Sequence, residues 1–181
     1  MLINITNRTE ERKMKKTYFA ECRCSEDLKE LYRKLALANH PDRGGDTEVM
    51  KAINAEFDTT FERLKNIHRS IKEGTEPYYT AQKATTETAG EFRDIIEALL
   101  KMEGVTVELI GRWIWVTGNT KEYKDTLKAM GFRWAAKKLA WSWHKDEDWT
   151  SSRGKYSLDD IRGKYGATQF EKEEEERKQI A

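Results

Sequence analysis

The chain has 181 residues, of which 36% are charged, yet its formal net charge is only +1. The length fits one ordinary domain or two small ones, and the charge balance excludes the broad basic excess of a dedicated nucleic-acid-binding protein, so any such contact must be local. No apolar run reaches the length of a membrane span, and too few apolar residues precede Arg8 for a signal peptide, so we expect a cytoplasmic protein.

Two helices are predicted on either side of a turn in the first third of the chain. In the first, over residues 25–39, the apolar positions at helical spacing are Leu28, Leu31, Tyr32 and Leu35. In the second, over residues 46–66, they are Met50, Ile53, Phe57, Phe61 and Leu64. The two stripes should face each other in an antiparallel pair, leaving Lys29, Arg33 and Lys34 on the outer side of the first helix.

The turn between these helices contains the tripeptide His40, Pro41 and Asp42. Proline disfavours helical geometry in the residue before it, so the first helix must end at this point. Gly44 and Gly45 permit a sharp reversal of the backbone, and Asp46 or Thr47 can cap the next helix. The sequence therefore predicts a helical hairpin with an exposed tip.

Residues 31–43, together with the short continuation Gly44, Gly45 and Asp46, resemble the second helix and loop of a J-domain, the defining module of the DnaJ-type co-chaperones. The short loop is especially similar to those of polyomavirus large T antigens. The resemblance spans roughly residues 16–67. It implies an all-α domain that binds a DnaK-type heat-shock chaperone of the seventy-kilodalton class and stimulates its ATPase without performing chemistry itself.

The resemblance also implies roles for individual residues. Asp42 would engage an arginine of the chaperone, and His40 with Pro41 would shape the loop. The implied chaperone-binding set is Lys29, Arg33, Lys34, His40, Pro41, Asp42 and Arg43. The sequence departs from the family at Asn39, where an aromatic residue is usual, and in a short first helix over residues 17–24.

A linker is predicted over residues 71–87, where apolar periodicity stops and Gly74, Pro77 and several threonines occur. We therefore expect an N-terminal extension over 1–15, a J-domain over 16–70, a tryptophan-rich module over 88–148, and a short helix with a charged helical or disordered tail over 149–181.

The tryptophan-rich module is expected to be α+β, with the order α-β-β-α-β-β. Thr88 and Glu91 form a capping box for its first helix, and alternation from Val105 predicts a hairpin that turns at residues 111–112. A second helix should begin near Thr120, followed by another hairpin that turns within residues 135–140. The spacing of Lys128, Gly131, Trp134, Lys138 and Trp141 is similar to small modules of phage and mobile-element proteins, which suggests a phage origin.

Five of the six tryptophans lie between Trp113 and Trp143. One interpretation is that a small module needs large side chains to fill its core. The other is that aromatic rings with basic neighbours hold single-stranded nucleic acid or a client protein. The candidate contacts are Arg112, Trp113, Trp115, Arg133, Trp134, Lys137, Lys138, Trp141 and Trp143. Trp113 shares a strand face with Trp115, and Trp141 with Trp143, but which pair is buried stays open.

No catalytic or metal-binding set can be assigned. Cys22 and Cys24 are too close for an ordinary disulfide and lack partners for zinc, while His68 and His144 lie in different segments. We therefore expect no enzyme activity, no cofactor and no metal. The predicted function is a co-chaperone whose second module recruits a client, and our hypothesis is that this client is a nucleoprotein complex. The alternative is a nucleic-acid-binding accessory protein of a phage or mobile element, in which the J-like region is a structural hairpin or a chaperone decoy.

Overall fold

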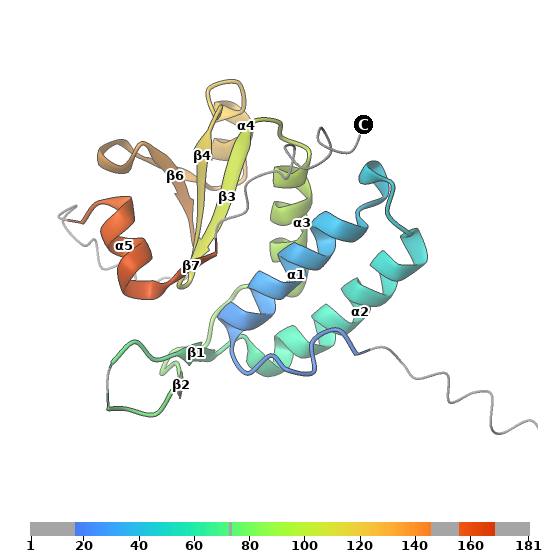
Figure 1. Cartoon of the computed structure of the whole chain (residues 1–181), viewed down its shortest axis with the longest axis vertical. Helices are drawn as coiled ribbons and strands as arrows, with labels where there is room; N and C mark the ends of the chain where they lie inside the picture. Colours follow the sequence, from blue (N-terminus) through green and yellow to red (C-terminus); the bar gives the residue numbers. More distant parts are fainter. Residues whose placement is uncertain (1–16, 73, 146–155, 169–181) are drawn as a thin grey trace, which may run out of the picture.

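The computed structural model describes residues 17–72, 74–145 and 156–168. Helices α1 (Ser25–Asn39) and α2 (Thr47–Leu64) form the expected antiparallel pair, joined by the short 3-10 turn η1 (Pro41–Arg43) (Figure 1). Asp46 caps α2 as predicted, since its Oδ1 accepts hydrogen bonds from the N–H groups of Glu48 (2.7 Å) and Val49 (3.3 Å).

The short first helix expected over residues 17–24 is wrong, because this segment forms turns. Its backbone finds another partner: the Glu56 carboxylate on α2 accepts the N–H groups of Tyr18 and Phe19, each at 3.0 Å. Eight residues gain little from helix formation after the cost of nucleation. The segment instead buries Phe19 and Cys22 against the helical pair.

Part of the predicted linker is folded structure. Strand β1 (Ile67–Arg69) pairs antiparallel with β2 (Tyr78–Thr80), and Glu87, just before the next helix, is 5% exposed. The segment therefore does more than tether two modules. The domain limits themselves stay predictions.

A helix and a small antiparallel sheet follow, as the α+β expectation required. The elements are α3 (Ala89–Leu100), β3 (Val105–Ile110), β4 (Trp113–Gly118), α4 (Lys124–Ala129), β5 (Arg133–Ala135), the 3-10 turn η2 (Ala136–Lys138), β6 (Ala140–Trp143), α5 (Leu158–Tyr165) and β7 (Ala167–Thr168). The strand order is β5-β6-β4-β3-β7, with β7 an addition that the sequence did not predict. The predicted extension over 1–15 and the charged tail lie outside the described residues.

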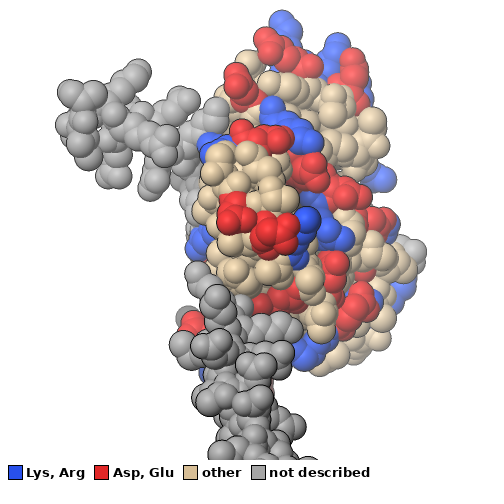
Figure 2. Space-filling view, turned by 90° about the vertical axis from the view of Figure 1, so that its right-hand side faces the viewer, with Lys and Arg blue, Asp and Glu red and all other residues tan. Residues whose placement is uncertain are grey.

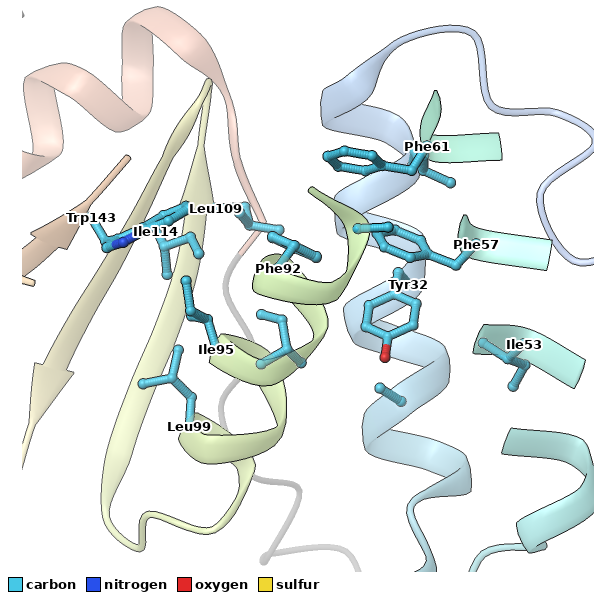
Figure 3. Close-up of a cluster of buried hydrophobic side chains, with 14 of the residues drawn as sticks. Tyr32, Ile53, Phe57, Phe61, Phe92, Ile95, Leu99, Leu109, Ile114 and Trp143 are labelled. Carbon is cyan, nitrogen blue, oxygen red and sulfur yellow. The ribbon is translucent and has the colours of Figure 1, made fainter. Parts of the chain in front are cut away.

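Helix α3 lies between the helical pair and the sheet and packs on both (Figure 3). Phe92 stacks on Phe57 of α2, with ring centroids 5.7 Å apart, and meets Tyr32 of α1 edge-on at 6.0 Å. Toward the sheet, Ile95 and Leu99 belong to the same buried cluster as residues of β3, β4 and β6. One continuous hydrophobic cluster therefore joins the two units.

The opposite face of the sheet carries a smaller cluster. It consists of Ile110, Trp115, Ala140 and Leu158, the last of which belongs to α5. The sheet is thus covered on both faces, by α3 on one and by α5 on the other (Figure 1). Among the described helices, none is both long and apolar enough to cross a membrane.

Candidate functional site

The loop between α1 and α2 turns His40 inward and Asp42 outward. The His40 side chain is 11% exposed and that of Asp42 is 65% exposed. His40 Nδ1 accepts a hydrogen bond from the Asp42 N–H at 3.2 Å, so the imidazole fixes the backbone that carries the carboxylate. The backbone of His40 is extended, which is the geometry that Pro41 imposes on the residue before it. The exposed tip predicted from the sequence is confirmed.

Two glycines close this loop. Gly44 adopts a φ of 83°, in the left-handed region, and Gly45 donates its N–H to the His40 carbonyl at 3.0 Å. A Cβ placed on Gly45 would lie 2.1 Å from the Asn39 carbonyl carbon and oxygen. The loop can therefore be this short only because residue 45 has no side chain.

We expect Gly45→Ala to destabilise the protein by about 1–3 kcal/mol, because the added carbon meets rigid backbone and forces the loop to shift. Urea unfolding would measure the change. Gly44→Asn is the matched control: its Cβ meets open space and asparagine tolerates positive φ, so it should stay within about 0.5 kcal/mol of the wild type. Equal stability of Gly45→Ala and wild type would show that the loop does not depend on this contact.

The expected basic outer face of α1 is wrong for two of its three residues. Lys29 is 8% exposed and Arg33 is 4% exposed. Lys34 alone is open to solvent, where it pairs with Glu30 at 3.0 Å. The reason is tertiary, since α3 and β3 pack against this side of α1.

Lys29 is held by groups from outside the helical pair. Its Nζ lies 2.5 Å from Glu87 Oε2 and sits over the Phe92 ring, 5.2 Å from the centroid. The Phe61 ring of α2 is on another side at 5.8 Å. A cation placed between aromatic faces and a carboxylate is compensated for its lost hydration.

Arg33 reaches the sheet. Its NH1 donates a hydrogen bond to the Val107 carbonyl on β3. Burial lowers the pKa of Arg33 to about 10, with Glu30 and Glu108 opposing the change, so the guanidinium stays charged at neutral pH. Glu108 is fully buried and pairs with Arg162 of α5, through Nε to Oε1 at 3.0 Å and NH2 to Oε2 at 2.6 Å.

Sequence reasoning missed Glu87 and Glu108 as partners of the basic residues. Glu108 had a usable signal, because a lone carboxylate in an otherwise apolar strand end indicates a buried ion pair. Glu87 had none, since an acidic residue among threonines in a presumed linker is usually solvated.

The tryptophans of the described residues separate into two packed pairs and one exposed ring. Trp141 and Trp143 are 6% and 8% exposed and belong to the main cluster, facing α3. Trp115 is 5% exposed and packs with the partly buried Trp113 in the smaller cluster beside α5. Both strand faces are therefore core, and Trp134, 48% exposed, differs from the other four.

The structure does not bring all the candidate client or nucleic-acid contacts together. Arg133 and Trp134 lie on β5, next to Lys137 and Lys138 in η2. Arg112 lies in the β3–β4 turn at the other end of the sheet, where it lines a small polar pocket with residues of α1 and of the segment before α3. Only the β5 and η2 residues lie close together, at one edge of the sheet.

The two cysteines are buried residues. Both are free, and Cys24 caps α1 by accepting the Asp27 N–H at 3.5 Å. Burial raises the pKa of Cys22 to about 11 and that of Cys24 to about 12, so both thiols stay protonated at neutral pH. Across the described ranges, no group of three or more His, Cys, Asp or Glu side chains could hold a metal ion.

Comparison with known proteins gives one short similarity. A stretch of 33 residues is 54% identical to DnaJ protein homolog 2 of Allium porrum. It covers 18% of this chain and 8% of that protein, so it supports a J-domain and extends to nothing beyond it. No protein-family model matches the chain, and no solved structure matches it.

Proposed function

We propose that this chain is a J-domain co-chaperone that binds a DnaK-type chaperone in the cytoplasm and stimulates its ATPase, with no chemistry of its own. The observation that carries the proposal is the presentation of Asp42, an exposed carboxylate on a turn that His40 and Gly45 hold rigid. The short similarity to a DnaJ homolog supports it.

In this proposal the chaperone binds the loop between α1 and α2. Asp42 supplies a carboxylate for an arginine of the chaperone, a charge-assisted contact of well-defined geometry. Arg43, the next residue in the loop, is an exposed cation, and Lys34 is an exposed cation on α1. On the face that Figure 2 shows, Lys and Arg are interspersed with Asp and Glu in no large patch of one sign. Recognition then depends on a few charges near the loop, which set orientation and encounter rate more than affinity.

The second unit has a complementary role in the proposal: it selects the client on which the chaperone acts. Its attachment supports this role, because α3 fixes the sheet to the helical pair through Phe92. A client bound to the sheet would be held at a fixed position relative to Asp42. This arrangement would orient the client toward a chaperone bound at the loop.

The test is steady-state ATP hydrolysis by a bacterial DnaK-type chaperone, with and without this protein. We expect the wild type to raise the rate and both His40→Gln and Asp42→Asn to return it to the basal value, because each removes a part of the loop. Lys51→Gln is the matched control, since Lys51 is an exposed charged residue of α2 outside the loop and pairs with Glu48. Stimulation of the same size by the wild type and by both loop variants would refute the proposal.

One observation favours a second candidate, in which the J-like helices are a structural hairpin or a decoy. Two of the cations that the family resemblance assigns to chaperone docking are buried by Glu87 and the β3 backbone. A decoy binds the chaperone without raising ATP turnover, and a structural hairpin does not bind it. Surface plasmon resonance with immobilised chaperone, run beside the ATPase assay, separates the three outcomes.

A further inference from the structure

The β5–β6 hairpin and its flanking residues carry charge of one sign. Residues 131–145 contain four Lys or Arg and no Asp or Glu, in a protein whose net charge is +1. Lys145 is turned toward α3, where it pairs with Glu91 at 2.5 Å. Arg133 lies on β5, and Lys137 and Lys138 lie in the η2 turn. An anionic partner is therefore favoured at this hairpin.

The same hairpin exposes two large apolar side chains. Leu139 is 73% exposed and Trp134 is 48% exposed. Leu139 is also the one residue besides glycine that has a positive φ (50°) within the described ranges. That conformation costs an L-residue about 1–2 kcal/mol, and glycine or asparagine would avoid most of the cost. An exposed side chain gains little within the fold to offset the strain, which indicates that Leu139 serves a contact outside it.

The surface under these residues is rigid. Every residue of β6 is buried, and the ring of Trp134 lies 5.5 Å from that of Trp141 at an angle of 58°. Lys138 lies over the other face of the sheet, with Nζ 6.0 Å from the Trp115 centroid. A half-exposed ring backed by a packed one is preorganised for stacking, because little side-chain entropy is lost on binding.

We propose that this hairpin binds single-stranded nucleic acid. Trp134 stacks on one base, Leu139 packs against the adjacent sugar and base edge, and Lys137 with Arg133 contacts the phosphates. A single strand fits because its bases are open to stacking, whereas those of a duplex are not. An inserting membrane contact would gather its apolar groups at the tip, but Trp134 lies on the strand, with η2 between it and Leu139.

This site is independent of the proposed chaperone function. The β5–β6 hairpin lies at the side of the molecule opposite the His40 loop (Figure 1). Binding at one site therefore leaves the other open. The two proposals can fail separately, since one is read by oligonucleotide binding and the other by ATP turnover.

The test is fluorescence anisotropy of a labelled oligothymidylate of about 20 nucleotides, long enough to span one such site, with the full chain at several salt concentrations. Trp134→Ala should weaken binding by about 5- to 140-fold, the range for one stacked base. Lys137→Gln should lower the slope of log K against log salt by about 0.7, the value for one lost phosphate contact.

Leu139→Asn is the most informative variant, because asparagine accepts the backbone conformation and removes the apolar contact. We expect weaker oligonucleotide binding with an unchanged or higher melting temperature. Ile71→Asn, at a 44% exposed apolar residue elsewhere, and Lys51→Gln are the matched controls and should bind as the wild type does.

Three results would overturn the proposal. The first is no binding of the oligonucleotide. The second is binding that a duplex or polyglutamate competes equally well and that Trp134→Ala leaves unchanged, which would show general polyanion or acidic-protein affinity. The third is binding to phosphatidylserine vesicles without binding to the oligonucleotide, which would make the hairpin a membrane contact.

Discussion

Replacing Phe92 with alanine is expected to lower the free energy of unfolding by about 3–5 kcal/mol, near the upper limit for a single core truncation. Phe92 is fully buried and its ring touches both helices of the N-terminal pair, through Tyr32 and Phe57. Its loss leaves a cavity at the joint between the helices and the sheet, where rigid neighbours cannot collapse. Urea unfolding followed by tryptophan fluorescence and by circular dichroism would measure the change.

The two probes also test whether the units unfold together. Most tryptophans lie in the sheet unit, whereas the helical signal comes largely from α1 and α2. One shared cluster predicts coincident transitions in the wild type. Leu100→Ala, at a partly buried residue of the same helix, is the control and should cost less. Separate transitions in the wild type would contradict a single cooperative core.

Removing Glu87 is the second large change, and Glu87→Ala should cost about 3–5 kcal/mol because it leaves the Lys29 ammonium buried without its carboxylate. The paired replacement Lys29→Leu with Glu87→Leu should recover most of this loss. The native pair is itself imperfect: Glu87 Oε1 is buried without a hydrogen-bond partner in the described structure. An apolar pair avoids that desolvation cost.

Thermal and urea unfolding of the two single variants and the double variant would measure the coupling directly. Glu48→Ala is the control, because its pair with Lys51 is fully solvated and should give no measurable change. If Glu87→Ala were as stable as the wild type, the Lys29–Glu87 pair would contribute nothing to the free energy of unfolding.

The parts of the fold that the sequence predicted are set by local interactions. Pro41 ends α1 through its own ring, and the capping box of Thr88 and Glu91 begins α3 with the expected bonds. The strand alternation likewise correctly placed Trp113 and Trp115 on the same face of their strand. It could not say that both faces of the sheet are core, because that depends on where α5 packs.

The errors concern interactions between distant segments. The stripe containing Lys29 and Arg33 has the same spacing whether it faces water or a second unit, so its burial by Glu87 and β3 was not visible in the sequence. Residues 17–24 were expected as a helix because family resemblance supplied one, whereas Glu56 satisfies that backbone from another element. Strands β1 and β2 are three residues each, too short to show alternation.

The burial of Lys29 and Arg33 weakens the apparent affinity of any partner that binds this side of α1. Such a partner competes with α3 and β3 for the same surface, and its apparent dissociation constant rises in inverse proportion to the fraction of open molecules. If separation of the two units costs about 4 kcal/mol, roughly one molecule in a thousand is competent, and the affinity falls by the same factor. A ligand that holds the units together would then inhibit that partner without touching its binding site.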